Sequence, residues 1–112
     1  MKLLFVGDIV GRAGRKALND HLKGLVNYHH IDLVIANGEN AAAGYGLTGP
    51  ILKELFACGV DVVTSGNHIW DKKEIIPVLD REHRLLRPAN YPPGLPGRGT
   101  GVYETAGGIR VG

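Results

Sequence analysis

The sequence contains a single cysteine, Cys58, so no disulfide bond can form within the chain. That scarcity is typical of a protein that stays in a reducing compartment. The N-terminal stretch has one lysine and a short apolar run, without the length or the cleavage site of a secretory signal, so we expect a cytoplasmic protein. No apolar run approaches the roughly 18 residues that would cross a bilayer, which argues against a membrane protein.

Aromatic residues are also scarce, and neither sign of charge is in large excess. The chain has 13 Lys and Arg against 11 Asp and Glu, for a formal net charge of +2 at pH 7, and 6% of its residues are aromatic. Without a block of Lys and Arg, this composition gives no strong signal for a nucleic-acid or membrane partner. Glycine, in contrast, is abundant: 17 of 112 residues is about twice the average share.

Apolar patterns predict that strands and helices alternate over the first 80 residues. The expected strands are residues 3–6, 32–36 and 60–64, the first of them buried on both faces. The expected helices are residues 15–28, a second capped by Thr48 and ended by Gly59, and a third that Asp71 and Glu74 cap as a capping box. This alternation indicates an α/β fold with a parallel sheet and flanking helices.

The remainder of the chain predicts less regular structure. Residues 85–86 suggest a fourth short strand, residues 88–101 a loop rich in proline and glycine, and residues 102–111 a hairpin with a glycine turn. The chain then ends near a strand, which leaves a sheet edge without a partner. We therefore interpret residues 1–112 as one domain that is incomplete, the N-terminal portion of a larger one. The alternative is a small complete domain whose edge a homo-oligomer protects.

Three strand ends carry the chemistry. The first strand leads to Gly7-Asp8, the second to Gly38-Glu39-Asn40 and the third to Gly66-Asn67-His68. Because the carboxyl ends of parallel strands share one edge of a sheet, these side chains are expected to converge where ligands bind. Each end could instead be a simple turn, since Asp, Asn and Gly are common turn formers. Three such ends in register favour a site.

Two carboxylates in one crevice repel each other, and a cation relieves that repulsion. The mixture of oxygen and nitrogen donors suits Fe, Mn or Zn. A carboxylate can also bridge two such ions about 3.5–4 Å apart, as in two-metal phosphoesterases. The small residues 41–46 that follow Asn40 would let backbone and substrate approach closely.

These motifs resemble the first three motifs of the calcineurin-like metallophosphoesterases. Four longer segments are similar to the YmdB-like bacterial branch of that family: "LFVGDIVGRAGR", "IANGENAAAGYGLT", "TSGNHIWDKKEI" and "RPANYPPG". The similarity runs over essentially the whole chain. The resemblance implies a metallophosphoesterase-like sheet, a dinuclear metal site and hydrolysis of phosphodiesters such as 2',3'-cyclic nucleotides by a metal-activated water.

The resemblance also implies a role for each matching residue. Asp8 would bind the first metal ion, Glu39 would bridge both ions, and Asn67 would bind the second. His68 would act near the leaving group, as a proton donor or a stabiliser of transition-state charge. Asn40 would contact the metal centre or the phosphate.

The sequence departs from the wider family at two points. Many relatives have histidine two residues after the first aspartate, where this chain has Val10, a difference that the YmdB-like branch shares. Family members also supply further histidine ligands from a Gly-His-x-His motif, which is absent here. A non-catalytic fragment or assembly module that retains the α/β scaffold is therefore the alternative function.

Two further features bear on the substrate. Arg12, Arg15 and Lys16 lie at the start of the first helix, where cations oppose the helix dipole, so they either attract a phosphate or form a solvated basic face. Tyr45 could meet a nucleotide from the glycine-rich loop. A dinucleotide-binding fingerprint is not present, because Ile9 stands where its second glycine is needed.

Overall fold

The computed structural model describes all 112 residues. Its centre is a parallel sheet of three strands in the order β1 (Leu3–Val6), β2 (Leu33–Asn37) and β3 (Val62–Thr64). Each strand begins at the same end of the sheet, so the residues that follow Val6, Asn37 and Thr64 share the opposite edge. The predicted α/β class is confirmed, and the strand boundaries agree with the sequence expectation within two residues.

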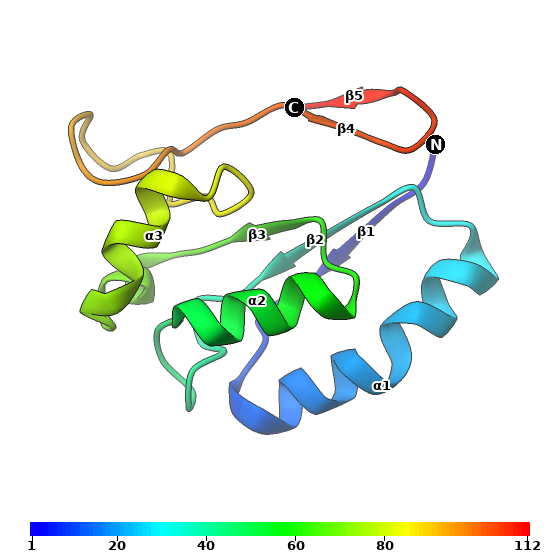
Figure 1. The fold of residues 1–112 in the computed structure, drawn as a ribbon, viewed down its shortest axis with the longest axis horizontal. Coiled ribbons are helices and arrows are strands. Elements are labelled where there is room, and N and C mark those ends of the chain that lie inside the picture. The colour runs from blue at the N-terminus through cyan, green and yellow to red at the C-terminus, as the bar shows by residue number, and fades with distance from the viewer.

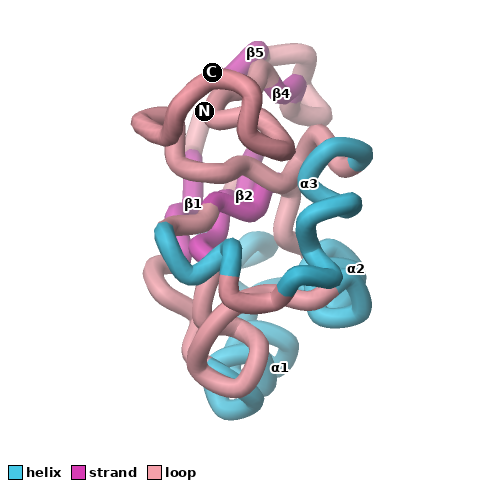
Figure 2. The backbone as a smooth tube through the Cα atoms, turned by 90° about the vertical axis from the view of Figure 1, so that its left-hand side faces the viewer, coloured by secondary structure: helices cyan, strands magenta, loops and turns pink.

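Two helices connect these strands and cover the same face of the sheet. They are α1 (Gly11–His29) and α2 (Gly49–Cys58), which lie side by side beneath the strands (Figure 1). Because both crossovers take the same hand while the sheet grows in one direction, both helices are placed on one side. A hairpin of β4 (Tyr103–Glu104) and β5 (Arg110–Val111) lies on the other side (Figure 2), as the sequence predicts.

The limits of α2 follow directly from local chemistry. The hydroxyl of Thr48 accepts a hydrogen bond from the Ile51 backbone N–H at 3.4 Å, which caps the first turn. Gly59 ends the helix in the left-handed region with φ 113°, and its N–H donates to the carbonyls of the last turn. Both predicted boundaries are confirmed.

The first helix and the first strand differ from the sequence expectation. Helix α1 starts at Gly11, one turn before the expected Arg15, and no side chain caps it. Strand β1 is an edge strand with one buried face: Leu4 and Val6 pack on the core, while Leu3 and Phe5 are 45% and 62% exposed. The expectation of burial on both faces was wrong because the core covers only the face of β1 that carries Leu4 and Val6.

The third helical region is shorter than expected and is not capped by Asp71. Two 3₁₀ turns, η1 (Asn67–Trp70) and η2 (Lys73–Ile75), precede the short helix α3 (Ile76–Arg81). The residue at the cap position of α3 is Ile75, and no side chain bonds to its first turn. The predicted capping box is therefore wrong, because the Asp71 carboxylate binds His68 instead.

Residues 85–86 form isolated bridges in place of the expected fourth strand. Leu85 pairs with Val63 in parallel, and Leu86 pairs with Arg98. The Ser65 hydroxyl donates to the Leu86 carbonyl at 2.7 Å, which attaches this segment to the residue that follows β3.

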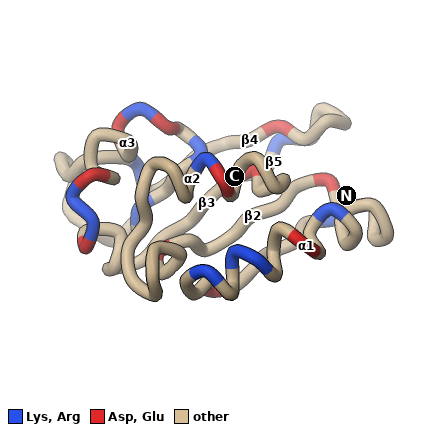
Figure 3. Tube along the Cα trace, turned by 60° about the horizontal axis from the view of Figure 1, so that its bottom comes forward, with Lys and Arg blue, Asp and Glu red and all other residues tan.

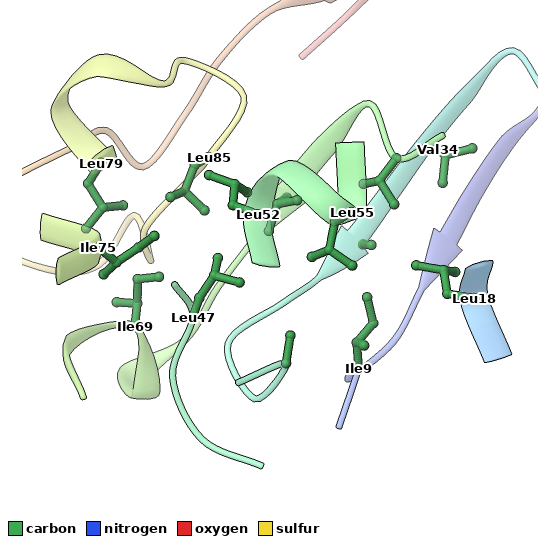
Figure 4. Packing of buried hydrophobic residues seen from close by; sticks show 14 of the residues in the cluster. Ile9, Leu18, Val34, Leu47, Leu52, Leu55, Ile69, Ile75, Leu79 and Leu85 are labelled. Carbon is green, nitrogen blue, oxygen red and sulfur yellow. The ribbon is translucent and has the colours of Figure 1, made fainter. Parts of the chain in front are cut away.

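A continuous apolar core lies between the sheet and the helices and extends beneath η1 and α3 (Figure 4). Ile69, Ile75, Leu79 and Leu85 are fully buried in it. Ile69 follows His68 directly, so the core holds the turn that carries one of the predicted site residues. No helix combines the length and the apolar character needed to cross a membrane.

Candidate functional site

Asp8 and Asn40 meet at the carboxyl edge of the sheet. The side-chain amide of Asn40 lies 3.0 Å from each carboxylate oxygen of Asp8 and donates to them. The chain leaving β1 is fixed by its backbone, since the Ile9 N–H donates to the Asn37 carbonyl at 3.1 Å. Two strand ends that are 32 residues apart in sequence are therefore joined by one side-chain pair.

The main-chain carbonyl of Asn40 also forms hydrogen bonds. Its carbonyl accepts from the N–H of Gly11 at 3.0 Å and from the N–H of Gly44 at 3.2 Å. Asn40 thereby connects Asp8, the first residue of α1 and the loop of residues 41–46. Ala43, Gly44 and Gly46 of that loop have positive φ, which explains the preference for small residues there.

Glu39 is held between β2 and the turn after β3. Its Oε2 accepts from the His68 backbone N–H at 3.1 Å, and its Oε1 accepts from the Asn37 side-chain amide at 3.4 Å. A β-carbon at Gly66 would overlap this carboxylate. The glycine of the Gly-Asn-His motif therefore leaves the space that the Glu39 side chain fills.

His68 points its ring towards a second acid. The Nδ1 atom donates to Asp71 Oδ2 at 2.6 Å. This hydrogen bond raises the pKa of His68 above its ordinary value, the charges of Asp71, Glu39 and Asp8 act in the same direction, and desolvation opposes them. An imidazole that retains its proton at higher pH is suited to donate that proton to a leaving group.

The remaining predicted residues lie at or beyond the border of this cluster. Asn67 begins η1 and is exposed. Tyr45 is 51% exposed, and the Lys72 ammonium lies 4.3 Å from its ring centre. Arg12 lies in the first turn of α1 and lines an open pocket with Arg15 and residues of the 41–46 loop. Neither Tyr45 nor Arg12 forms a hydrogen bond or an ion pair with the carboxylates of the cluster.

The sequence reasoning missed the role of Asp71 and of Asn37. Asp71 stands three residues after His68, a spacing that places both on one side of a turn, and this spacing was available in the sequence. Asn37 was assigned to neither the strand nor the site. It is the last residue of β2, and it exchanges two hydrogen bonds with Glu39, one from each residue.

The side chains at this edge offer an unpaired oxygen to a metal ion, but they offer few ligands in all. Asn40 donates its amide nitrogen to Asp8, so its Oδ1 is left as a buried acceptor without a partner, and a cation would satisfy that oxygen. Two carboxylates and the amide of Asn67 belong to the same edge. No group of three or more His, Cys, Asp or Glu side chains in these 112 residues is arranged to hold a metal ion.

Comparison with known proteins gives a consistent assignment. The 2',3'-cyclic-nucleotide 2'-phosphodiesterase of Bacillus subtilis (strain 168) is 45% identical over 108 residues, covering 96% of this chain and 40% of that relative. A solved structure of a hypothetical protein from Thermus thermophilus superposes with a TM-score of 0.88 at 45% identity, covering 96% of this chain and 41% of the other.

A second solved structure, a novel phosphatase from Mycoplasma pneumoniae, superposes with a TM-score of 0.86 at 35% identity and covers 93% of this chain and 38% of the other. The chain thus spans about 40% of the length of these relatives. A sequence model of the YmdB-like proteins matches residues 4–112. The chain therefore belongs to the YmdB-like family, whose metallophosphoesterase-type fold it shares.

Proposed function

We propose that the chain supplies part of a metal-dependent phosphoesterase site that hydrolyses phosphodiesters such as 2',3'-cyclic nucleotides by attack of water on phosphorus. The observation that carries this proposal is the edge cluster, in which Asn40 holds Asp8 and leaves its own buried oxygen without a partner. The phosphodiesterase name of the Bacillus subtilis relative supports the same reaction.

The roles of Asp8, Glu39 and Asn40 are supported by their contacts, and that of Asn67 by the family resemblance and its place after β3. Asp8, Glu39, Asn67 and the Oδ1 of Asn40 would hold two ions, drawn from Fe, Mn or Zn. When bound, such ions acidify water and withdraw charge from phosphoryl oxygens. The Asn40 amide keeps the Asp8 carboxylate in one orientation.

His68 is suited to the leaving group. The Asp71 carboxylate fixes its Nδ1 as a donor, which leaves Nε2 free to carry the second proton, and it raises the pKa of the ring. A protonated Nε2 can give its proton to the departing oxygen, or stabilise the negative charge that develops there. The Glu39 carboxylate holds the backbone N–H of the same residue, which fixes the position of the ring relative to the carboxylates.

The test combines metal binding and turnover. Calorimetric titration with Mn²⁺ and hydrolysis of a chromogenic phosphodiester are compared for the wild type, Glu39→Gln and the control Glu74→Gln, an exposed acid in the segment that follows His68. We expect Glu39→Gln to lose binding and turnover, and Glu74→Gln to retain both. Equal binding and equal rates in wild type and Glu39→Gln would remove the role assigned to Glu39.

The alternative is a non-catalytic module that retains the scaffold. One observation favours it: no three His, Cys, Asp or Glu side chains form a group that could hold a metal ion. The same experiment separates the two functions. Metal binding that depends on Glu39 without any turnover would identify the module, and turnover that depends on Glu39 would identify the enzyme. A cytoplasmic location and a homo-oligomeric state stay predictions.

A further inference from the structure

An open pocket of about 330 Å³ lies beside the 41–46 loop, and none of the residues of the edge cluster lines it. Its walls come from the first turn of α1, the loop, the first turn of α2 and the segment after η1. Three of its seven lining residues are cationic and none is acidic. The lining residues are Arg12, Arg15, Ala42, Ala43, Thr48, Ile51 and Lys72.

The charges of this basic pocket are only partly compensated. The Arg15 guanidinium donates to the Ala41 carbonyl at 2.6 Å and pairs with the exposed Glu54 at 3.3 Å. Arg12 forms no salt bridge, and Lys72 contacts the ring of Tyr45, which leaves its charge intact. Two positive charges therefore face the pocket without a carboxylate partner.

The helices reinforce this potential. Helix α1 contributes Arg12 from its first turn and Arg15 from the start of its second, and α2 contributes Ile51 from the first turn after its Thr48 cap. The positive ends of two helix dipoles therefore adjoin the pocket. Neither first turn contains an acidic residue. Figure 3 shows positive residues at the beginning of α1, where an acid would be more favourable for the helix. The arginines at the beginning of α1 are therefore unfavourable for the stability of the helix.

Residues that line the basic pocket are neighbours in the chain of residues bonded to the edge cluster. Asn40 binds Asp8 through its side chain, and its carbonyl binds Gly11, the residue before Arg12. Lys72 follows Asp71, the partner of His68, and its side chain lies against Gly46 of the loop. A ligand bound to the cluster therefore has the basic pocket within the same group of loops.

We propose that the basic pocket binds a phosphoryl group other than the one that is hydrolysed. A terminal phosphate monoester carries a charge of about −1.5 to −2 at pH 7, which matches the two uncompensated cations. The guanidinium of Arg12 and the hydroxyl of Thr48 are suitable donors to its oxygens. The preferred substrates are then phosphodiesters that carry a second phosphoryl group. This substrate class depends on the proposed function, whereas the binding of phosphate does not.

The first experiment measures the basic pocket without metal. Inorganic phosphate is titrated into the ¹⁵N-labelled chain with EDTA at constant ionic strength. We expect saturable shifts at the amides of Arg12, Ala43 and Ile51. Arg12→Gln and Lys72→Gln should each weaken binding by about tenfold, because each removes a charged partner of the anion.

The matched control is Lys16→Gln. Lys16 lies one turn after Arg12 on the same helix, pairs with Asp20 and does not line the basic pocket, so this change removes the same charge from the same helix. It should leave the affinity for phosphate unchanged. Equal weakening in Lys16→Gln and Arg12→Gln, or shifts confined to residues 66–68, would overturn the proposal. Shifts confined to residues 66–68 would still agree with a phosphoesterase site.

The second experiment identifies the source of the phosphate. A dinucleotide with a 5'-phosphate and the same dinucleotide without it, each with a phosphorothioate linkage that slows hydrolysis, are titrated in the presence of Zn²⁺, which is diamagnetic. We expect the 5'-phosphate to improve binding by about tenfold in the wild type and by less than twofold in Lys72→Gln. Equal affinity of the two dinucleotides in the wild type would overturn the substrate class, and would assign the basic pocket to free phosphate if the first experiment succeeds.

Discussion

The carboxylate of Glu39 occupies the space that a β-carbon would need at residue 66. Gly66 has φ −130° and ψ −153°, an extended conformation that any residue can adopt. The glycine is therefore required for space and not for an unusual backbone angle. This relationship places the acid of one strand end directly against the turn of the next, and it makes the glycine part of the candidate site.

Replacing Gly66 with alanine should consequently displace Glu39 and leave the fold intact. The clash falls on the end of a flexible side chain, which can move away. We expect Gly66→Ala to lose Mn²⁺ binding as fully as Glu39→Gln, with a change in unfolding free energy of less than about 1 kcal/mol. Calorimetric titration and urea unfolding measure the two effects. Gly24→Ala is the control. Gly24 lies within helix α1 at a position where an added β-carbon would meet no other atom, so this change should stabilise the chain by about 0.5–1 kcal/mol. Metal affinity that survives in Gly66→Ala would contradict the steric argument.

The pairing of Asn40 with Asp8 leads to a second prediction. Asn40→Asp places a carboxylate where an amide now donates to Asp8 at 3.0 Å. Because Asp8 is exposed, the repulsion should lower the unfolding free energy by about 1 kcal/mol without divalent ions. Added Mn²⁺ should restore the loss. Asn40→Ala, which removes the amide without adding charge, is the control and should gain less stability from Mn²⁺ than Asn40→Asp. Equal stability of Asn40→Asp with and without Mn²⁺ would show that no cation binds there.

The His68–Asp71 pair predicts a shift in titration. Asp71 raises the pKa of His68 through its hydrogen bond first and its charge second. Asp71→Asn should therefore lower the pKa of His68, as measured by NMR of the imidazole in metal-free protein. Glu74→Gln removes a charge from the same segment and should leave that pKa near its wild-type value. An unchanged pKa in Asp71→Asn would contradict the assigned contact.

The same shift fixes the sign of a pH effect on stability. The pKa of His68 in the folded chain lies above the unfolded value of 6.5, so the folded state binds the proton more tightly. Its stabilising contribution is complete below pH 6.5 and is lost as the pH rises through the folded pKa. Unfolding measured on either side of this range should show the wild type gaining more stability on acidification than Asp71→Asn.

Ile69 provides a test of how the core supports the site. Its side chain is fully buried beneath the turn that carries His68. Ile69→Ala should lower the unfolding free energy by about 2–5 kcal/mol, because it leaves a cavity in a packed core. Val102→Ala, at a position that is 59% exposed, should change it by less than about 0.5 kcal/mol. Urea unfolding checks both. Similar losses in the two variants would show that the turn does not depend on the core.

Sequence alone was sufficient where the determining chemistry is local. The Thr48 cap, the Gly59 stop and the polar residues after each strand are read from neighbours in the chain, and their positions agree with the structure. The meeting of Asp8 with Asn40 could also be anticipated, because parallel strands bring their carboxyl ends together. The direction of each side chain at that edge could be learned only from the three-dimensional structure.

The failures involve residues whose partners are decided by tertiary structure. Asp71 followed by Glu74 matches a capping box, but the same aspartate is also three residues from His68, and the sequence cannot rank the two partners. Arg12 and Lys72 line one pocket from segments 60 positions apart, which no local pattern reveals. Strand β1 is apolar at every position, so its composition could not indicate that Leu3 and Phe5 would be exposed.

The outer edge of strand β1 has no partner strand, and this bears on Asp8, which follows the strand. Its backbone pairs with β2 on one side only, so any segment that adds alongside it, from this chain or another, would form hydrogen bonds with residues 3–6. Asp8 lies two residues beyond that ladder. Pairing at this edge would restrain the backbone that leads to Asp8, so the first acid of the candidate site lies at the end of the least restrained strand of the sheet.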